Sequence, residues 1–376
     1  MKTLDLKAVA LTATAALAAF SLAACSGGSS QSGAESGSAA AKEPLATTSE
    51  QLTGSIAGAG ASSQEAAMEA WKAGFQSAQP DVTVAYDAVG SGAGITQFTD
   101  GQVAWAGSDA PLEGDEIAAA EARCGGPAWA LPVYISPVAV VFNLPGVDSL
   151  NLDAATIAKI FRGDIKTWDD AAIAATNPGV TLPSTAITPV HRADKSGTTE
   201  NFTDYLHAAA PEVWTDEASK EWPVSGGESG DKTSGLIQAV TAGEGAIGYA
   251  DASQAGTLGT AALAAKDGSF VKFSNETAAK AAETAARPEG RAANDLALSV
   301  NRVPDTNDSY PLVLVSYSIV CSAYDKAEDA ALVKAFVGYQ VSEEGQQMAS
   351  DHAGSAPLSD ALRQQVVTAL DEIAGK

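Results

Sequence analysis

The sequence predicts an α/β fold of two lobes, each a mostly parallel sheet flanked by helices. Strand and helix patterns alternate along most of the chain, and turns rich in glycine and serine join them. Two long apolar, β-rich runs lie far apart in the sequence and suit strands that pass from one lobe to the other. A chain of 376 residues is long enough for about two domains.

The first 24 residues indicate a secretory signal and not part of the fold. Lys2 and Lys7 precede an apolar run, and Leu22-Ala23-Ala24 then leads to Cys25. Because a cysteine directly after Leu-Ala-Ala matches the bacterial lipobox, we expect Cys25 to be lipid-modified, bearing palmitate, at the start of the mature chain. Plain secretion with an incidental cysteine is the alternative. Residues 25–49 are then a flexible tether of small polar residues, and no later apolar run is long enough to span a bilayer.

The first lobe begins with strands and helices joined by turns of small residues. Strands are expected at 53–59, 82–86 and 103–107, and helices at 64–78 and around Ile95 and Phe98. Within the first helix, Ala67, Trp71, Phe75 and Ala78 share one face, which should lie against the core.

The two crossing strands are expected at 130–142 and 310–320. Between them the alternation repeats, with helices at 153–161, 200–209 and 234–240 and strands at 185–190 and 246–250. Residues 253–309 are alanine-rich and polar, and their pattern predicts no path; three helices then close the chain. Two crossings predict a discontinuous first domain, 50–134 plus 313–376, and a second domain, 135–312.

Two cysteines remain once Cys25 carries lipid. Outside the cell Cys124 and Cys321 most simply form a disulfide, which would bring two distant parts of the chain together. Two buried free thiols are the alternative.

The charge of the chain limits its partners. The formal net charge is −24, and removal of residues 1–24 makes it −25. A chain this acidic is not expected to bind nucleic acid or to carry a polybasic membrane patch. An anionic ligand would have to be held by local dipoles and one or two cations.

Small polar residues follow four of the expected strands. These loops are Ala61-Ser62-Ser63, Gly90-Ser91-Gly92, Ser108-Asp109 and the stretch from Arg192 to Thr198. Three run into helix N-termini, where free N–H groups carry a partial positive charge of about half a unit. With the guanidinium of Arg192 they could surround an oxyanion, whereas Lys195 is expected to face solvent. For a single loop, an ordinary turn with a Ser/Thr cap explains the pattern equally well.

Two other functional classes fit the sequence less well. An extracellular hydrolase would need a nucleophile or a metal, but there is no G-x-S-x-G elbow, and His191, His207 and His352 lack the spacing of metal ligands. We therefore expect no metal, no cofactor and no catalytic residues. A lipoprotein that only binds other proteins would explain the anchor but not the loops beside Arg192.

The sequence resembles the phosphate-binding lipoproteins that serve the ABC phosphate importer. The motifs are Gly58-Ala59-Gly60-Ala61, Gly90-Ser91-Gly92-Ala93-Gly94, Gly107-Ser108-Asp109-Ala110-Pro111, the stretch 160–168, His191-Arg192-Ala193-Asp194 with Ser196-Gly197-Thr198, and Gly245-Ala246-Ile247-Gly248-Tyr249. The resemblance implies a type II periplasmic-binding-protein fold that captures inorganic phosphate in an interdomain cleft. It also implies delivery to the transmembrane subunits of an ABC permease at the extracytoplasmic face of the membrane, and we expect a monomer.

The resemblance also implies a set of ligand residues. The phosphate-binding positions are Ser62, Ser63, Ser91, Asp109, Arg192, Ser196, Gly197 and Thr198, and Asp194 matches the carboxylate that orients the arginine. This chain departs from the family pattern at Ser62-Ser63, where the family has Thr-Phe. Backbone donation should survive the change, but the aromatic wall of the site should not.

Asp109 is expected to select phosphate over sulfate. Phosphate still carries a proton near neutral pH, its relevant pKa being roughly 6 to 7 by analogy with phosphoesters. An ionised Asp109 can accept that proton in a hydrogen bond. Sulfate has no proton to offer and would leave two acceptors facing each other in a desolvated site.

Overall fold

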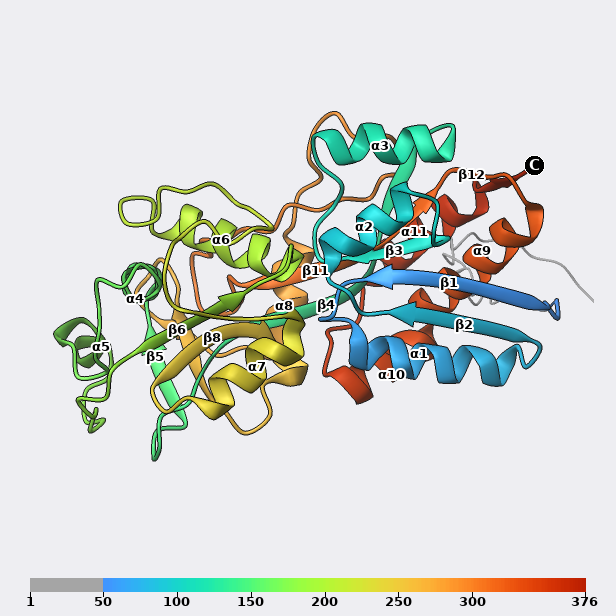
Figure 1. Ribbon diagram of the computed structural model, residues 1–376. Helices are drawn as coiled ribbons and strands as arrows, with labels where there is room; N and C mark the ends of the chain where they lie inside the picture. The colour runs from blue at the N-terminus through green and yellow to red at the C-terminus, as the bar shows by residue number, and fades with distance from the viewer. Residues whose placement is uncertain (1–49) are drawn as a thin grey trace, which may run out of the picture. The chain divides into compact units, whose positions relative to one another are not determined.

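The computed structural model describes residues 50–376, and strands and helices alternate through most of them (Figure 1). The predicted signal, Cys25 and the tether lie outside the described residues. The strands are β1 (Gly54–Gly60), β2 (Val82–Asp87), β3 (Trp105–Ser108), β4 (Ala128–Phe142), β5 (Ser149–Leu152), β6 (Thr188–Arg192), β7 (Glu228–Gly230), β8 (Ala246–Asp251), β9 (Gly259–Ala264), β10 (Phe270–Val271), β11 (Val313–Cys321), β12 (Ala323–Tyr324) and β13 (Ala374–Gly375). The helices are α1 (Glu65–Ala78), α2 (Ser91–Thr99), α3 (Asp115–Cys124), α4 (Ala154–Phe161), α5 (Ala171–Thr176), α6 (Gly197–Ala209), α7 (Lys232–Ala242), α8 (Asn275–Glu283), α9 (Ala327–Val341), α10 (Glu343–Ala353) and α11 (Asp360–Asp371), with a 3₁₀ turn at Ala252–Gln254.

The main sheet has two parallel groups of strands on either side of an antiparallel pair. Its strand order is β2-β1-β3-β11-β4-β8-β6-β7, with β9 pairing with β4 and joined in turn by β5 and β10. Strand β1 runs parallel to β2 and β3, and β6 runs parallel to β7 and β8. The central strands β4 and β11 are the two predicted crossing runs, and they pair antiparallel with each other. The predicted α/β fold is confirmed, whereas the division into two domains stays a prediction.

The two central strands are buried along nearly their whole length. Every residue of β11 is buried, and so is every residue of β4 after Ala128, because neighbouring elements cover both faces. The pairing between them shifts register at Ser316/Tyr317. Such a shift disturbs the alternation of side chains, and here it lies at Ser316, one of the two serines of this strand.

The N-terminal and C-terminal parts of the described chain share one core. On α1, the predicted face is buried at Ala67, Trp71 and Phe75. Phe75 meets Phe336 of α9 edge-on with 5.3 Å between ring centroids, and the Trp71 indole N–H donates to the carbonyl of Gly345 in α10 at 2.8 Å. Ala78, also expected on this face, is exposed at the end of the helix.

The predicted disulfide is confirmed. Cys124 at the end of α3 is bonded to Cys321 at the end of β11, with 5.3 Å between their Cα atoms. The bond joins the first part of the chain to the strand that returns to it, 197 residues later.

Loss of this disulfide should lower stability strongly, because it closes a very long loop and so restricts the unfolded chain. The variant Cys124→Ala/Cys321→Ala is expected to lose about 2–5 kcal/mol of the free energy of unfolding. Thermal unfolding followed by circular dichroism measures the loss. Wild-type protein in reductant should be destabilised similarly, whereas reductant should not affect the double variant; equal melting temperatures for all four samples would contradict this expectation.

Several details differ from the sequence-based expectation. Helix α3 was not expected, because it is rich in alanine and charged residues and has Ile117 as its only large aliphatic side chain. Strand β6 extends through Arg192 instead of ending at Val190, because the short strand β7 pairs with Val190–Arg192. Helix α6 begins at Gly197, since the Ser196 side chain caps it by accepting from the Thr199 N–H. The stretch 253–309, for which no path was predicted, contains β9, β10 and α8.

Candidate functional site

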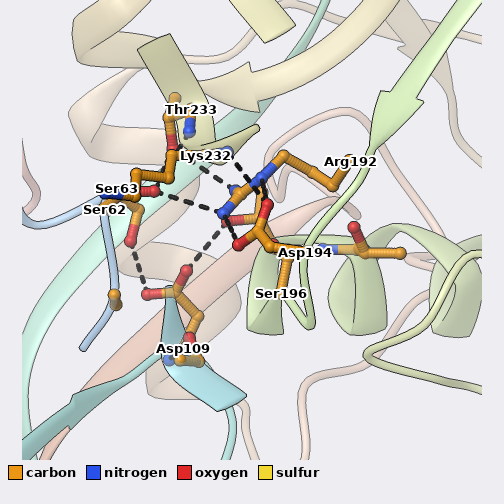
Figure 2. A network of polar contacts seen from close by, with 12 residues as sticks. Ser62, Ser63, Asp109, Arg192, Asp194, Ser196, Lys232 and Thr233 are labelled. Atoms are coloured by element: carbon orange, nitrogen blue, oxygen red, sulfur yellow. Dashed lines mark hydrogen bonds and ion pairs between the residues drawn. The ribbon is translucent and has the colours of Figure 1, made fainter. Parts of the chain in front are cut away.

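The residues expected to bind the ligand lie together at the carboxyl ends of β1, β2, β3 and β6 (Figure 2). The carboxyl ends of parallel strands are where α/β proteins commonly bind ligands. Strands β1, β2 and β3 run towards the cluster from one side, and β6, which has the opposite direction in the sheet, runs towards it from the other. The loops after β1, β2 and β6 run into α1, α2 and α6. Seven of these residues are each at most 3% exposed, and these are Ser62, Ser63, Ser91, Asp109, Arg192, Ser196 and Thr198.

Asp109 is the acceptor at the centre of this cluster. Its Oδ1 accepts from the hydroxyls of Ser63 and Ser316, both at 2.6 Å, and its Oδ2 accepts from the Thr198 hydroxyl at 2.8 Å. The carboxylate therefore joins the loop after β1, the start of α6 and the central strand β11. The hydroxyl of Ser63 takes part directly, although the resemblance had suggested only a backbone role at this position.

Arg192 faces Asp109 from the other side of the cluster. Its Nε and Nη2 donate to the two carboxylate oxygens of Asp194 at 2.8 and 2.6 Å, so one edge of the guanidinium is held in a bidentate pair. The other N–H groups point to Ser62 Oγ, 3.3 Å from Nη2, and to Thr233 Oγ1, 3.4 Å from Nη1. Figure 2 shows the guanidinium between Asp194 on one side and Ser62 on the other.

Asp194 is held in its charged form. Burial by itself would raise the pKa of Asp194, but the hydrogen bonds and positive charge of Arg192 outweigh burial, and the N–H of Lys232 adds a further bond at 2.9 Å. The pKa of Asp194 is therefore lowered from its ordinary value. A charged Asp194 fixes the orientation of Arg192 and compensates part of its charge.

The remaining predicted residues lie close to Asp109. Ser91 Oγ accepts from the Asp109 N–H at 3.2 Å. Ser196 Oγ accepts from the Thr199 N–H at 3.2 Å, which leaves the hydroxyl proton of Ser196 free to be donated. All the residues predicted to bind phosphate thus gather at one place, together with Asp194.

Two glycines allow these loops to approach so closely. A Cβ atom on Gly197 would lie 2.8 Å from the Asp109 Cβ and 2.9 Å from Ser91 Oγ. At Gly90, where φ is +93°, a Cβ atom would lie 2.3 Å from Asp194 Oδ2. Since real Cβ contacts are longer, any side chain at either position would push the two loops apart.

Other residues that contact this cluster were not predicted from the sequence. Among them are Asn201, Lys232, Thr233 and Ser316. Three of them carry a signal in the sequence. Asp231-Lys232-Thr233 is another short polar turn before a helix, and Ser316 is a polar residue inside an apolar strand.

A buried acid beside the cluster, Glu200, should make stability depend on pH. Its Oε2 has no hydrogen-bond partner among residues 50–376. Burial raises the pKa of Glu200 to about 7; the Lys220 ammonium, 3.9 Å away, opposes this rise, and Glu113 and Glu116 add to it. The folded protein therefore holds the Glu200 proton to higher pH than the unfolded chain, in which the pKa of Glu200 has its ordinary value of 4.5. The stabilisation that this proton contributes is complete below pH 4.5 and is lost as pH rises through about 7.

Glu200→Gln, which stays neutral, should therefore lose less stability than the wild type between about pH 5 and about pH 8. Urea unfolding at several pH values measures this difference. Glu121→Gln, at an exposed position of α3, is the matched control and should follow the wild type. Parallel pH profiles for Glu200→Gln and the wild type would contradict the expectation.

The described residues give no support to a metal centre. Between residues 50 and 376 no three His, Cys, Asp or Glu side chains gather in a way that could hold a metal ion. His191 stacks on Trp222 with 5.1 Å between ring centroids, and its Nδ1 lies 2.9 Å from the carbonyl oxygen of Arg192. Both contacts give it a packing role beside the cluster. None of the helices in this range is both long and apolar enough to cross a membrane.

Comparison with known proteins places the chain in a family. Residues 45–344 match the PBP superfamily domain. The chain is 40% identical over 321 residues to the phosphate-binding protein PstS 3 of Mycobacterium leprae, an alignment that covers 84% of this chain and 86% of the relative. The chain belongs to the PstS family of phosphate-binding proteins. Another PstS protein, PstS 3 of Mycobacterium tuberculosis, is 39% identical over 324 residues, which is 84% of this chain and 85% of that relative.

Solved structures agree with this PstS assignment at the level of the fold. A periplasmic phosphate-binding protein called PfluDING, solved with phosphate, superposes with a TM-score of 0.67 at 23% identity and covers 85% of this chain and 93% of its own. A phosphate-binding protein of Stenotrophomonas maltophilia gives a TM-score of 0.67 at 22% identity, covering 84% and 93%. The two mycobacterial PstS 3 relatives are named as phosphate-binding proteins and not as enzymes.

Proposed function

We propose that this chain binds inorganic phosphate between the loops that surround Asp109 and Arg192, and delivers it for import. The observation that carries the proposal is the composition of the cluster. Hydroxyl and N–H donors gather there with one guanidinium, and Asp109 faces them as a carboxylate acceptor. A hydrogen phosphate ion suits this arrangement because it is an anion that still carries one proton.

Each proposed ligand has a defined role. Ser62, Ser91 and the first turn of α6 donate to the oxygens of the anion, Arg192 supplies the positive charge, and Asp109 accepts the phosphate proton. The family membership and the names of the relatives support this choice of ligand.

The proposed ligands belong to two domains that can close on each other. Ser62, Ser63, Ser91 and Asp109 fall in the predicted domain 50–134 plus 313–376, and Arg192 falls in 135–312. In this proposal β4 and β11 are the only crossing segments, and bending there opens and closes the cleft. Phosphate binds first to one domain, and the second then covers it.

The chain would act outside the cytoplasm, tethered to the membrane through a lipid on Cys25. Its partners would be the transmembrane subunits of an ABC permease, which the closed, phosphate-bound monomer meets. The predicted signal and tether in the sequence support this placement, as does the name of its relatives.

Calorimetric titration tests the function. Protein freed of bound phosphate by unfolding and refolding is titrated with phosphate, arsenate and sulfate. Saturable one-to-one binding of phosphate, with much weaker binding of sulfate, is the expected result. Absence of phosphate binding would refute the proposal, and turnover of a chromogenic phosphate ester would favour the hydrolase alternative instead. Tight binding of sulfate would favour a carrier for another oxyanion.

Phosphate binding should change the tryptophan fluorescence, and Trp222 should report it. Trp71 and Trp105, which lie near the loops in sequence, are completely buried, whereas the partly buried Trp222 stacks on His191, next to Arg192. A fluorescence titration is expected to show a saturable change in the wild type that Trp222→Phe largely removes without loss of binding by calorimetry. A full-sized change in Trp222→Phe would show that another indole reports the binding.

A further inference from the structure

A fifth segment, outside the predicted ligand set, reaches the cluster at the start of α7. Thr233 is the second residue of that helix, and its side chain is buried, with 1% of the residue exposed. Its Oγ1 lies 2.8 Å from Ser62 Oγ and accepts a hydrogen bond from Arg192 Nη1 at 3.4 Å. Figure 2 shows Thr233 beside Ser62 and facing the guanidinium.

More donors than acceptors meet around these two hydroxyls. Ser62 Oγ accepts from the N–H of Thr233 at 3.1 Å and from Arg192 Nη2 at 3.3 Å, and Thr233 Oγ1 accepts from Arg192 Nη1. Only one of the two hydroxyl protons can lie in the hydrogen bond between Ser62 Oγ and Thr233 Oγ1, so the other needs a further acceptor. Two hydroxyl oxygens provide few lone pairs for so many protons. Phosphate oxygens would supply stronger, charged acceptors at this point.

The backbone of α7 aims Thr233 at the cluster. Lys232 has a φ of 62°, and within residues 50–376 it is the one residue other than glycine with a positive φ. This conformation turns the Lys232 N–H to Asp194 Oδ1 and the following N–H, that of Thr233, to Ser62 Oγ. The first turn of α7 therefore faces the same point as the first turn of α6.

We propose that Thr233 is a further phosphate ligand, which donates its hydroxyl to an anion seated between Ser62 and Arg192. The inference rests on the proposed function and deepens it, because it adds a donor that the family pattern does not assign. Phosphate would then be held by five segments of the chain.

The test compares Thr233→Val, which keeps the shape but removes the hydroxyl, with Thr233→Ser, which keeps the hydroxyl. Calorimetry should show a Kd for phosphate about 10- to 100-fold higher in Thr233→Val, since a hydrogen bond to a charged group is lost. Thr233→Ser should stay close to the wild type. Thr156→Val is the matched control, because Thr156 is also a buried threonine in the first turn of a helix, α4, remote in sequence from the four loops.

A double-mutant cycle separates direct donation from mere positioning of Ser62. If Thr233 donates to the anion itself, Thr233→Val should still weaken binding when Ser62 is already alanine; if it only orients Ser62, the effect should vanish in that background. Near-UV circular dichroism checks the fold, and Thr233→Ala replaces any valine variant that does not fold.

The outcomes are distinct. Weakened binding in Thr233→Val, rescue in Thr233→Ser and persistence in the Ser62→Ala background support the inference. Unchanged binding in Thr233→Val, an equal loss in Thr233→Ser, or no effect in the Ser62→Ala background overturns it while the proposed function stands. A wild-type protein that binds no phosphate overturns both.

Discussion

Arg192→Ala is expected to weaken phosphate binding at least 100-fold, corresponding to at least about 2.8 kcal/mol. Arg192 is 3% exposed and paired with Asp194, so its charge acts on the ligand with little screening by water. The alanine variant loses the cation and also leaves the Asp194 carboxylate, whose side chain is only 14% exposed, without its charged partner, so that it repels an incoming anion. Both effects act in the same direction.

Lys195→Ala is the matched control. Lys195 is a cation three residues further along, but its side chain is 64% exposed and pairs with Glu221 at the surface. Because exposed charges contribute little, its loss should change the Kd for phosphate by no more than about twofold. Equal effects of the two substitutions in calorimetry would show that net charge, and not the placed guanidinium, holds the ligand. Full-strength binding by Arg192→Ala would show that the site lies elsewhere.

Asp109→Asn is expected to remove most of the discrimination between phosphate and sulfate. In the wild type a dianionic sulfate would face the carboxylate with no proton between two acceptors, which costs several kcal/mol in a desolvated site. Asparagine has no negative charge and can donate from Nδ2, so it accepts sulfate while losing the bond to the phosphate proton. The ratio of the two Kd values should fall by about 100-fold or more.

Competition calorimetry with both anions measures this ratio. Asp87→Asn, at an exposed position at the end of β2, serves as the control for a general loss of negative charge and should keep the wild-type ratio. Unchanged rejection of sulfate by Asp109→Asn would mean that selectivity comes from another part of the site. The hydroxyls of Ser63, Thr198 and Ser316 are then the groups to examine. A hydroxyl whose proton is donated elsewhere presents only lone pairs to the ligand, and it would also reject an anion that has no proton.

Much of the fold could be predicted from sequence because its strongest patterns are local. The long apolar runs that became β4 and β11 read as buried strands without any knowledge of their partners. Helix α3 and strand β7 could not be predicted in this way. Helix α3 is held by the loop after β3 and by the disulfide at its end. Strand β7 is only three residues long and is stabilised by its pairing with β6. Both are fixed by tertiary contacts.

The same distinction applies to the site. Ser62, Ser91, Ser196 and Gly197 stand in short loops of small polar residues before helices, so the sequence predicted that they would converge around an oxyanion. Ser316 reaches Asp109 from a strand that the sequence places more than 200 residues away, and the register shift beside it is invisible before the strands are paired. The position of Thr233 depends on the left-handed backbone conformation of Lys232. Glycine is the usual sequence signal of that conformation, and position 232 is not a glycine.

The central claim is that donors from separate loops meet around one protonated anion. A crystal structure of the wild-type protein grown with phosphate tests it most directly. We expect a single tetrahedral anion within hydrogen-bond distance of Ser62, Ser91 and Arg192, with one oxygen about 2.5–2.7 Å from an Asp109 carboxylate oxygen. Phosphate bound at any other place, with Arg192 still hydrogen-bonded only to Asp194, Ser62 and Thr233, would contradict it.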